Sequence, residues 1–229
     1  MKKLNFKFGL LFSKNIRSYY YLEILKRYDF IPSIIIEFPN NKISKKINQK
    51  HKFEIKKKKD VYKYFKKKTD IVTIDNKKNL LIDNFLKSNL KYFIFAGNYG
   101  QILPKEFFKN KKKIIHVHPG DLPFFKGSTT HYYEYLLKNK ITYTSIFLSK
   151  HLDSGKIIFK KKYNPNKINF SRIDDYYDPL FRSETLIQTL EHINKDKMEK
   201  NVKKNKNFYK DYYVIHPLLK HLSIIKSKF

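Results

Sequence analysis

Short apolar runs rich in β-branched and aromatic residues alternate with longer amphipathic segments from residue 4 to residue 163. The short runs predict buried strands, and the longer segments, with apolar residues at helical spacing, predict helices. Strands that alternate with helices are typical of βαβ units. We therefore expect an α/β fold with a Rossmann-like, mostly parallel sheet flanked by helices. The expected strands are Leu4–Phe12, Ile31–Phe38, Ile71–Ile74, Tyr92–Ala96, Ile114–His118, Ile141–Leu148 and Lys156–Tyr163, and the expected helices are Asn15–Tyr28, Leu80–Leu90 and one between Gly127 and Ile141.

The highly charged segment Pro39–Lys68 interrupts this pattern and predicts an exposed connection with one or two solvated helical turns. Ser13 is the expected N-cap of the first helix, and Ser128 is the expected N-cap of the helix after Gly127. In that later helix Tyr133, Leu136 and Leu137 are expected to face inward. His131 and Glu134 are expected to have surface roles.

The pattern changes after Tyr163. A turn cluster at residues 164–166 precedes a predicted helix, Leu180–Ile193, and a lysine-rich link, Asn194–Asn207. The tail Tyr212–Leu219 is apolar enough to dock back on the core. We therefore expect a catalytic domain over residues 1–163 and a short α/β C-terminal extension over residues 164–229 that packs on it.

The formal net charge of +30 suggests a nucleic-acid partner, but only four of the 50 basic residues are arginine. Recognition of bases and phosphates usually depends on arginine, so we expect a lysine-coated surface without a specific nucleic-acid partner. RNA binding through lysines alone stays open as an alternative, and such binding would collapse with salt.

The chain contains no cysteine, which excludes disulfides and a thiol nucleophile. No stretch approaches the roughly 20 apolar residues of a membrane helix, and the N-terminus does not fit a signal peptide. We expect a soluble, cytoplasmic protein, and a homodimer is compatible with the sequence.

Candidate chemistry gathers between residues 97 and 155, where five of the six glycines lie. His116 and His118 are separated by one residue on a predicted strand, so both imidazoles face the same side. Asp153 follows another predicted strand and could orient a histidine or accept a proton. Two histidines and a carboxylate are also a metal-ligand pattern, so a metal-dependent hydrolase using these three residues is an alternative.

These motifs resemble the folate-dependent formyltransferases, the family of glycinamide ribonucleotide, methionyl-tRNA and amino-sugar formyltransferases. The family pattern is Asn-x-His-Pro-Ser-Leu-Leu-Pro, a nearby glycine, a helix, a strand and Asp-x-Gly. The chain departs from it at two positions, with His116 in place of the asparagine and Gly120 in place of the serine. The matching residues, in order, are His118-Pro119, Leu122-Pro123, Gly127 and Asp153-Ser154-Gly155, preceded by the segment Tyr99–Pro104.

The resemblance implies transfer of a formyl group from 10-formyltetrahydrofolate to a primary amine. In this reading His118, assisted by His116, stabilises the oxyanion, and Asp153 keeps the histidine charged and helps to remove the amine proton. The sequence predicts no metal. The residues expected to contact folate are Gln101, Ile102, Leu103, Pro119, Gly120, Leu122 and Pro123.

The amine that accepts the formyl group is predicted by arguing against two of the acceptors that the family uses. Glycinamide ribonucleotide enzymes carry a Gly-x-Gly-type phosphate loop after the first strand, whereas residues 12–16 here contain no glycine. Methionyl-tRNA enzymes carry an extra C-terminal domain, for which the roughly 65 residues after Tyr163 are expected to be too few. A small amine remains, and we expect a nucleotide-linked amino sugar, with methionyl-tRNA and glycinamide ribonucleotide as alternatives.

Overall fold

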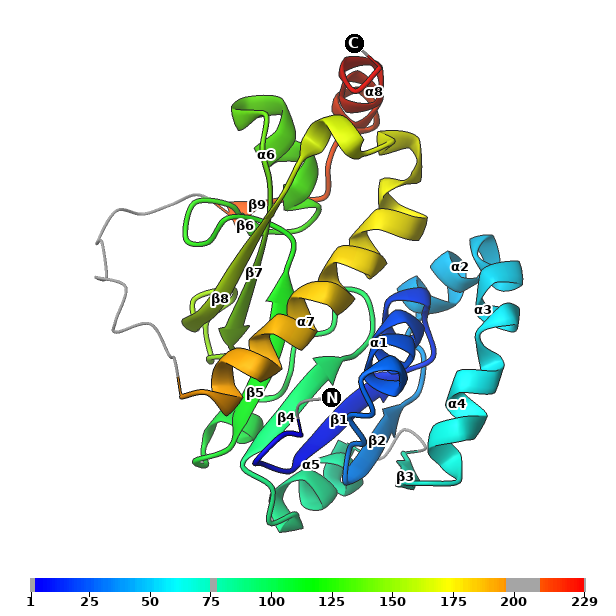
Figure 1. The fold of residues 1–229 in the computed structure, drawn as a ribbon, viewed down its shortest axis with the longest axis vertical. Coiled ribbons are helices and arrows are strands. Elements are labelled where there is room, and N and C mark those ends of the chain that lie inside the picture. Colours follow the sequence, from blue (N-terminus) through cyan, green and yellow to red (C-terminus); the bar gives the residue numbers. More distant parts are fainter. Residues whose placement is uncertain (1–2, 75–77, 197–210, 229) are drawn as a thin grey trace. The chain divides into compact units, whose positions relative to one another are not determined.

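The computed structural model describes residues 3–74, 78–196 and 211–228 (Figure 1). The chain divides into two compact units, Met1–His116 and Val117–Phe229. The boundary lies within strand β5 (Lys113–His118), whose last two residues belong to the second unit. Most of the predicted link Asn194–Asn207 lies outside the described residues.

The first unit is a parallel sheet with strand order β3-β2-β1-β4-β5. Helix α1 contacts β4 and helix α5 contacts β2, as expected for βαβ units (Figure 1). The prediction of an α/β fold with a mostly parallel sheet is confirmed. The elements are β1 (Phe8–Ser13), α1 (Ile16–Arg27), β2 (Ile34–Phe38), α2 (Lys42–Lys50), α3 (Lys52–Lys57), α4 (Lys59–Lys66), β3 (Asp70–Thr73), α5 (Lys78–Lys87), β4 (Tyr92–Ala96), the 3₁₀ helix η1 (Lys105–Phe108) and β5.

The connection between β2 and β3 differs from the prediction. The segment Pro39–Lys68 forms three helices, and the last of them, α4, packs against α1. Val61 and Phe65, four residues apart, are both buried. Residues at this spacing lie on one face of a helix, and the many lysines around them obscured that apolar face in the sequence.

The N-cap of α1 is Asn15, not Ser13. The Asn15 side chain accepts a hydrogen bond from the Ser18 N–H at 3.1 Å, whereas Ser13 is the last residue of β1. Asparagine and serine are both good caps, so the strand simply runs one residue further than predicted.

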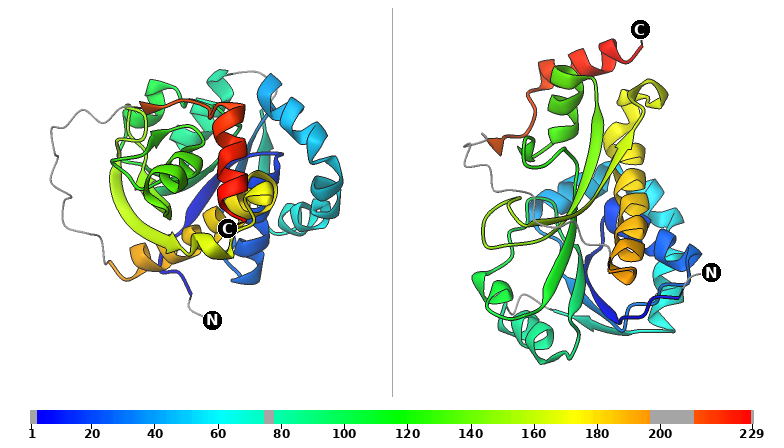
Figure 2. Two further views of the ribbon diagram at one scale, coloured as in Figure 1. Left: turned by 90° about the horizontal axis from the view of Figure 1, so that it is seen from above. Right: turned by 60° about the vertical axis from the view of Figure 1, so that its left-hand side comes forward.

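The second unit centres on the antiparallel pair β7 and β8, against which the long helix α7 packs. Helix α8 lies beside α6 (Figure 2). A short two-stranded parallel ladder joins β6 and β9. The elements are β6 (Lys126–Gly127), α6 (Thr130–Lys138), β7 (Ile141–Phe147), β8 (Lys156–Tyr163), the 3₁₀ helices η2 (Pro165–Lys167) and η3 (Phe170–Arg172), the π-helix η4 (Ile173–Tyr177), α7 (Asp178–Asn194), β9 (Asp211–Tyr212) and α8 (Pro217–Lys226).

The inward face of α6 was predicted wrongly. Its N-cap position is Thr129 rather than Ser128, and the helix buries Tyr132 and Tyr135 while Leu137 is 60% exposed. The Tyr135 ring stacks on Phe170 with centroids 4.0 Å apart. Aromatic burial thus selected the face, because tyrosine rings bury more apolar area than leucine side chains.

The C-terminal tail docks in part. Ile215 is buried, but Tyr213, Val214 and Leu218 are exposed. The division into a domain over residues 1–163 and an extension over residues 164–229 stays a prediction. Among the described residues, no helix combines the length and the apolar character needed to span a membrane.

Candidate active site

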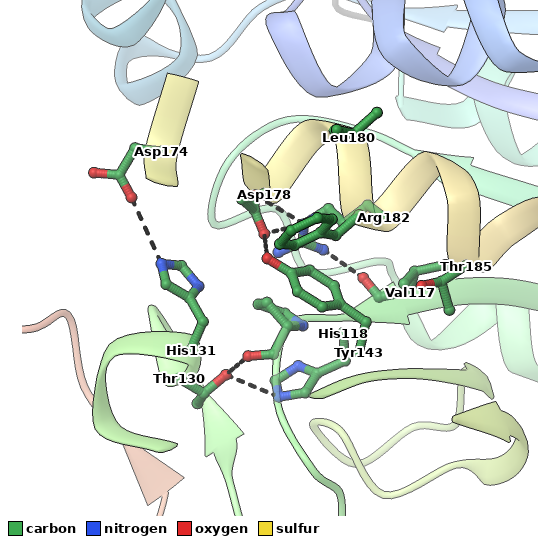
Figure 3. A network of polar contacts seen from close by, with 12 residues as sticks. Val117, His118, Thr130, His131, Tyr143, Asp174, Asp178, Leu180, Arg182 and Thr185 are labelled. Carbon is green, nitrogen blue, oxygen red and sulfur yellow. Dashed lines mark hydrogen bonds and ion pairs between the residues drawn. The ribbon is translucent and has the colours of Figure 1, made fainter. Parts of the chain in front are cut away.

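His118 is the last residue of β5 and is only 2% exposed. Its Nε2 lies 2.7 Å from the Phe125 carbonyl oxygen and 3.2 Å from Thr130 Oγ1. The Thr130 hydroxyl donates its own hydrogen to the Pro119 carbonyl oxygen, so the Thr130 oxygen faces the ring as an acceptor (Figure 3). Two acceptors around Nε2 require that this nitrogen carries a hydrogen. The other ring nitrogen, Nδ1, is therefore the one left for chemistry.

Asp153 faces that second nitrogen. Its Oδ1 lies 3.5 Å from His118 Nδ1, and the carboxylate is 8% exposed. The Gly127 N–H donates to Asp153 Oδ2 at 2.9 Å, and the Asp153 backbone has a φ of 45°, which is uncommon for a non-glycine residue. The turn after β7 therefore holds the carboxylate in one orientation, with one oxygen fixed and one facing the histidine. The predicted approach of Asp153 to His118 occurs within the second unit.

The Pro119–Pro123 turn, predicted to contact folate, is fixed by two residues of the neighbouring strands. Thr144 Oγ1 donates to the Gly120 carbonyl oxygen at 2.7 Å. Lys160 Nζ lies 2.6 Å from Asp121 Oδ1. Leu122 is 1% exposed and packs in a small core with Ile146 and Ile157, so it anchors the turn to the core, and its contact with folate stays a prediction.

Gly120 occupies a position without room for a side chain. A Cβ there would lie 2.7 Å from Thr130 Oγ1 and 2.9 Å from the Phe125 carbonyl oxygen, the two acceptors of His118. We expect Gly120→Ser to displace these acceptors at a cost of about 1–3 kcal/mol. The turnover number should fall roughly tenfold or more, as measured by steady-state kinetics beside a melting curve. Full activity in this variant would show that the two acceptors do not position the ring.

A buried ion pair lies behind the strand that carries His118. Arg182 Nε lies 2.8 Å from Asp178 Oδ1, and the Arg182 Nη1 group donates to the Val117 carbonyl oxygen (Figure 3). The Tyr143 hydroxyl donates to the same Asp178 oxygen at 3.1 Å. Arg182 thereby links helix α7 by a hydrogen bond to the main chain of the residue before His118. Arg182 is thus paired and only 6% exposed.

The remaining predicted site residues belong to the first unit. His116 is half-buried on β5, with its ring centroid 5.8 Å from that of Phe95. Gln101 Oε1 accepts from the Asn98 N–H at 2.8 Å, while Ile102 is 81% exposed and Leu103 is buried. Their assignment to the oxyanion and to folate stays a prediction.

The loop between β1 and α1 is occupied by its own side chains. Asn15 caps the helix and also donates to the Gly97 carbonyl oxygen at 3.1 Å. Lys14 Nζ lies 2.6 Å from Glu37 Oε1. A helix N-terminus binds a phosphate through free N–H groups, and here the Ser18 N–H is taken by Asn15.

The surface roles expected for His131 and Glu134 are wrong, because both side chains are buried. His131 Nε2 lies 3.6 Å from Asp174 Oδ1 (Figure 3). Lys220 pairs with the other Asp174 oxygen. Burial acts to raise the pKa of Asp174, but neighbouring His131 and Lys220 outweigh it and hold that pKa below its usual range. Both carboxylate oxygens of Asp174 thus face basic side chains of the second unit.

Glu134 joins α6 to β7. Its carboxylate accepts from the Thr142 N–H at 3.1 Å and from the Thr142 hydroxyl at 2.6 Å. Burial raises the pKa of Glu134, and the hydrogen bonds from Thr142 oppose this rise only in part.

Glu134→Gln is expected to gain stability relative to the wild type as the pH rises. A carboxyl whose pKa is raised in the folded state binds its proton more tightly there, so the wild type loses stability as pH rises from the unfolded pKa towards the folded one. The glutamine carbonyl oxygen can still accept from the Thr142 N–H, its NH2 group can donate to Thr142 Oγ1, and it carries no titrating proton. Free energies of unfolding between pH 4 and pH 7 test the prediction, and a difference independent of pH contradicts it.

Several residues of the site carry no signal in the sequence. Thr130 looks like an ordinary first residue of a helix, and Phe125 contributes only its carbonyl oxygen. Asp178 is the partner that makes Arg182 a buried residue. Main-chain acceptors are fixed by tertiary packing, so spacing along the chain does not reveal them. The four-residue spacing of Asp178 and Arg182 indicates a pair on one helix but not its burial.

Comparison with known proteins now identifies the family. The model described as "Formyl transferase" matches residues 41–167. Among curated protein sequences, none matches this chain.

Solved structures share the fold. A sugar N-formyltransferase from Shewanella sp. FDAARGOS_354 is 14% identical with a TM-score of 0.57, covering 96% of this chain and 87% of that one. Glycinamide ribonucleotide transformylase 1 from Symbiobacterium toebii is 14% identical with a TM-score of 0.58, covering 88% and 96%. Methionyl-tRNA formyltransferase from Clostridium thermocellum is 15% identical with a TM-score of 0.54, covering 93% and 74%.

The predicted formyltransferase fold is therefore confirmed. The match over residues 41–167 spans more than half of the 229 residues and includes the His118 turn and the Asp153 turn. This chain is a member of the formyl transferase family.

Proposed function

We propose that this enzyme transfers the formyl group of 10-formyltetrahydrofolate to the primary amine of a small acceptor. Membership of the family supports a folate-derived formyl donor. The observation that carries the proposal is the buried pair of His118 and Asp153, in which Nδ1 of the ring faces a carboxylate oxygen at 3.5 Å.

The reaction needs a proton to move while negative charge develops on oxygen. The amine nitrogen forms a bond to the formyl carbon, and the formyl oxygen becomes an oxyanion. The bond from that carbon to N10 of the folate then breaks, N10 takes up a proton, and the amine loses one. Catalysis therefore requires a hydrogen-bond donor for the oxyanion and a base for the amine proton.

His118 and Asp153 supply both groups. Phe125 and Thr130 hold the hydrogen on Nε2, so a second proton on Nδ1 makes the ring a cationic donor to the oxyanion. Asp153 stabilises that cation and accepts the amine proton, directly or through water. His116, in the position of the family asparagine, would be a second donor to the same oxygen.

Folate contacts are proposed for the main chain of two segments. These are Gln101–Leu103 in the first unit and Pro119–Pro123 in the second. The exposed Ile102 adds an apolar side chain that suits a pterin. In the 119–123 turn the proposed contacts are to carbonyl oxygens, which have a second lone pair, because the Gly120 and Leu122 N–H groups already donate to His118 and Thr144.

For the acceptor we propose an amino sugar linked to a nucleotide. The loop between β1 and α1 contains no glycine, and Asn15 takes up the Ser18 N–H at the helix N-terminus, where a ribonucleotide phosphate would need free N–H groups. This observation disfavours glycinamide ribonucleotide. Methionyl-tRNA is the acceptor that the experiment must distinguish.

The test incubates the purified enzyme with 10-formyltetrahydrofolate and separate amines: nucleotide-linked amino sugars, glycinamide ribonucleotide and methionyl-tRNA. Amine-dependent release of tetrahydrofolate with an amino sugar is the expected result. Release that needs no amine and yields formate would favour the hydrolase alternative, and its dependence on a bound metal would be checked by elemental analysis. Release with glycinamide ribonucleotide or methionyl-tRNA alone would keep the reaction and refute the acceptor.

A further inference from the structure

Three contacts of the proposed catalytic pair come from one short segment, Phe125–Thr130. The Phe125 carbonyl oxygen and Thr130 Oγ1 accept from His118 Nε2, at 2.7 Å and 3.2 Å. The Gly127 N–H donates to Asp153 Oδ2 at 2.9 Å. The geometry of the pair therefore depends on what holds this segment in place.

The segment is held by residues more than 80 positions further along the chain, 211–215, which we call the C-terminal strap. Lys126 pairs with Asp211 and Gly127 with Tyr212 in the parallel ladder of β6 and β9. The Ser128 N–H donates to the Tyr212 carbonyl oxygen at 2.8 Å. In Figure 2 the strap, which leads into α8, runs beside the chain that leads into α6.

The side chain of Tyr212 packs between two aromatic rings of the same region. Its ring stacks on Phe125, with centroids 5.4 Å apart and planes inclined by 25°, and lies 4.7 Å from the Tyr133 ring. Its neighbour Tyr213 is 84% exposed. The strap thus contacts the segment through main-chain pairing at residues 126–128 and through the Tyr212 ring on Phe125, whose carbonyl oxygen orients the His118 ring.

The backbone of the segment also depends on the strap. Gly127 has a φ of 100°, and a Cβ there would lie 2.1 Å from the Tyr212 carbonyl oxygen. Thr129 has a φ of 50°, a strained value for a β-branched residue, and its Oγ1 accepts from the Ile215 N–H at 2.8 Å. A two-residue ladder has little stability of its own, so side-chain packing must support it.

We propose that the C-terminal strap, through Tyr212, is a positioning element for the active site. It fixes the Phe125 carbonyl, the Gly127 N–H and Thr130, and through them the orientation of His118 and Asp153. This inference rests on the proposed function for the roles of those two residues. Tyr212 itself is a positioning residue and takes no part in the chemistry.

Tyr212→Ala is expected to lower the turnover number roughly tenfold to a hundredfold, because a displacement of about 1 Å in a catalytic group has effects of this size. The KM for the formyl donor should change much less. Tyr212→Phe keeps the ring and should retain activity, and Tyr213→Ala is the matched control with expected wild-type activity.

A second measurement distinguishes positioning of His118 from a purely structural role of Tyr212. The imidazole NMR signals of His118 in the whole enzyme report the Nε2 hydrogen bond to Phe125. They should shift in Tyr212→Ala and not in Tyr213→Ala. If Tyr212→Ala does not fold, Tyr212→Leu keeps apolar contact without the ring and serves instead.

Equal activity and equal His118 signals in the Tyr212→Ala and Tyr213→Ala enzymes would overturn the inference. So would a loss of activity that the unfolded fraction explains completely. If the wild type transfers no formyl group to any amine, the proposed function fails, while the NMR comparison still tests the strap.

Discussion

His118→Ala is expected to reduce formyl transfer roughly a hundredfold to a thousandfold. The change removes the ring whose Nδ1 faces Asp153 at 3.5 Å and which is the proposed donor to the oxyanion. Losing one such donor in a water-excluded site typically costs this much in turnover number. Steady-state kinetics at saturating donor and acceptor measure the effect.

The control for this change is His221→Ala, because His221 is an exposed histidine on α8 of the same unit. Its activity should equal that of the wild type. Melting curves separate lost chemistry from lost folding, since His118 is also a buried, hydrogen-bonded side chain. A folded His118→Ala enzyme with more than a tenth of wild-type activity would refute the assignment.

Arg182→Met is expected to destabilise the protein by about 3–5 kcal/mol, because it removes the ion-pair partner of the buried Asp178 carboxylate. It also removes the donor to the Val117 carbonyl oxygen next to His118. Chemical denaturation gives the free energy of unfolding, and the remaining folded enzyme should show a reduced turnover number.

Two variants test whether burial causes this effect. Arg172→Met breaks a similar pair with Asp175, at 3.1 Å but exposed, and should cost no more than about 1 kcal/mol. The double change Arg182→Met with Asp178→Asn leaves no buried charge and keeps an oxygen for the Tyr143 hydroxyl, so it should recover much of the lost stability. A double variant less stable than Arg182→Met alone would contradict this explanation.

The predicted strands were confirmed because most of them are short, dense runs of apolar residues; the lysine-rich strand Lys156–Tyr163 is the exception. A parallel sheet is buried on both faces, and β1, which pairs in parallel with β2 and β4, is buried along its whole length. The helices α2 to α4 were missed because lysines dominate their composition, and only the spacing of Val61 and Phe65 shows the buried face. Local patterns therefore located the sheet better than its connections.

For the candidate site, the sequence predicted the reactive side chains, His118 and Asp153, but not the residues that orient them. The turns at His118 and Asp153 follow strand ends, which a periodicity pattern can locate. Their orientation depends on Phe125, on Thr130 and, through Tyr212, on the C-terminal strap. Such contacts join residues far apart in the chain through main-chain atoms and ring packing, and neither leaves a motif.

The central claim is that the His118 and Asp153 pair moves a formyl group onto an amine. Its most direct test is single-turnover transfer from donor labelled with carbon-13 in the formyl group, followed by mass spectrometry of the amine. We predict labelled N-formyl product with the wild type and a large, parallel loss of that product in His118→Ala and Asp153→Asn. Label recovered only as formate, or recovered on the amine equally in all three enzymes, would contradict the claim.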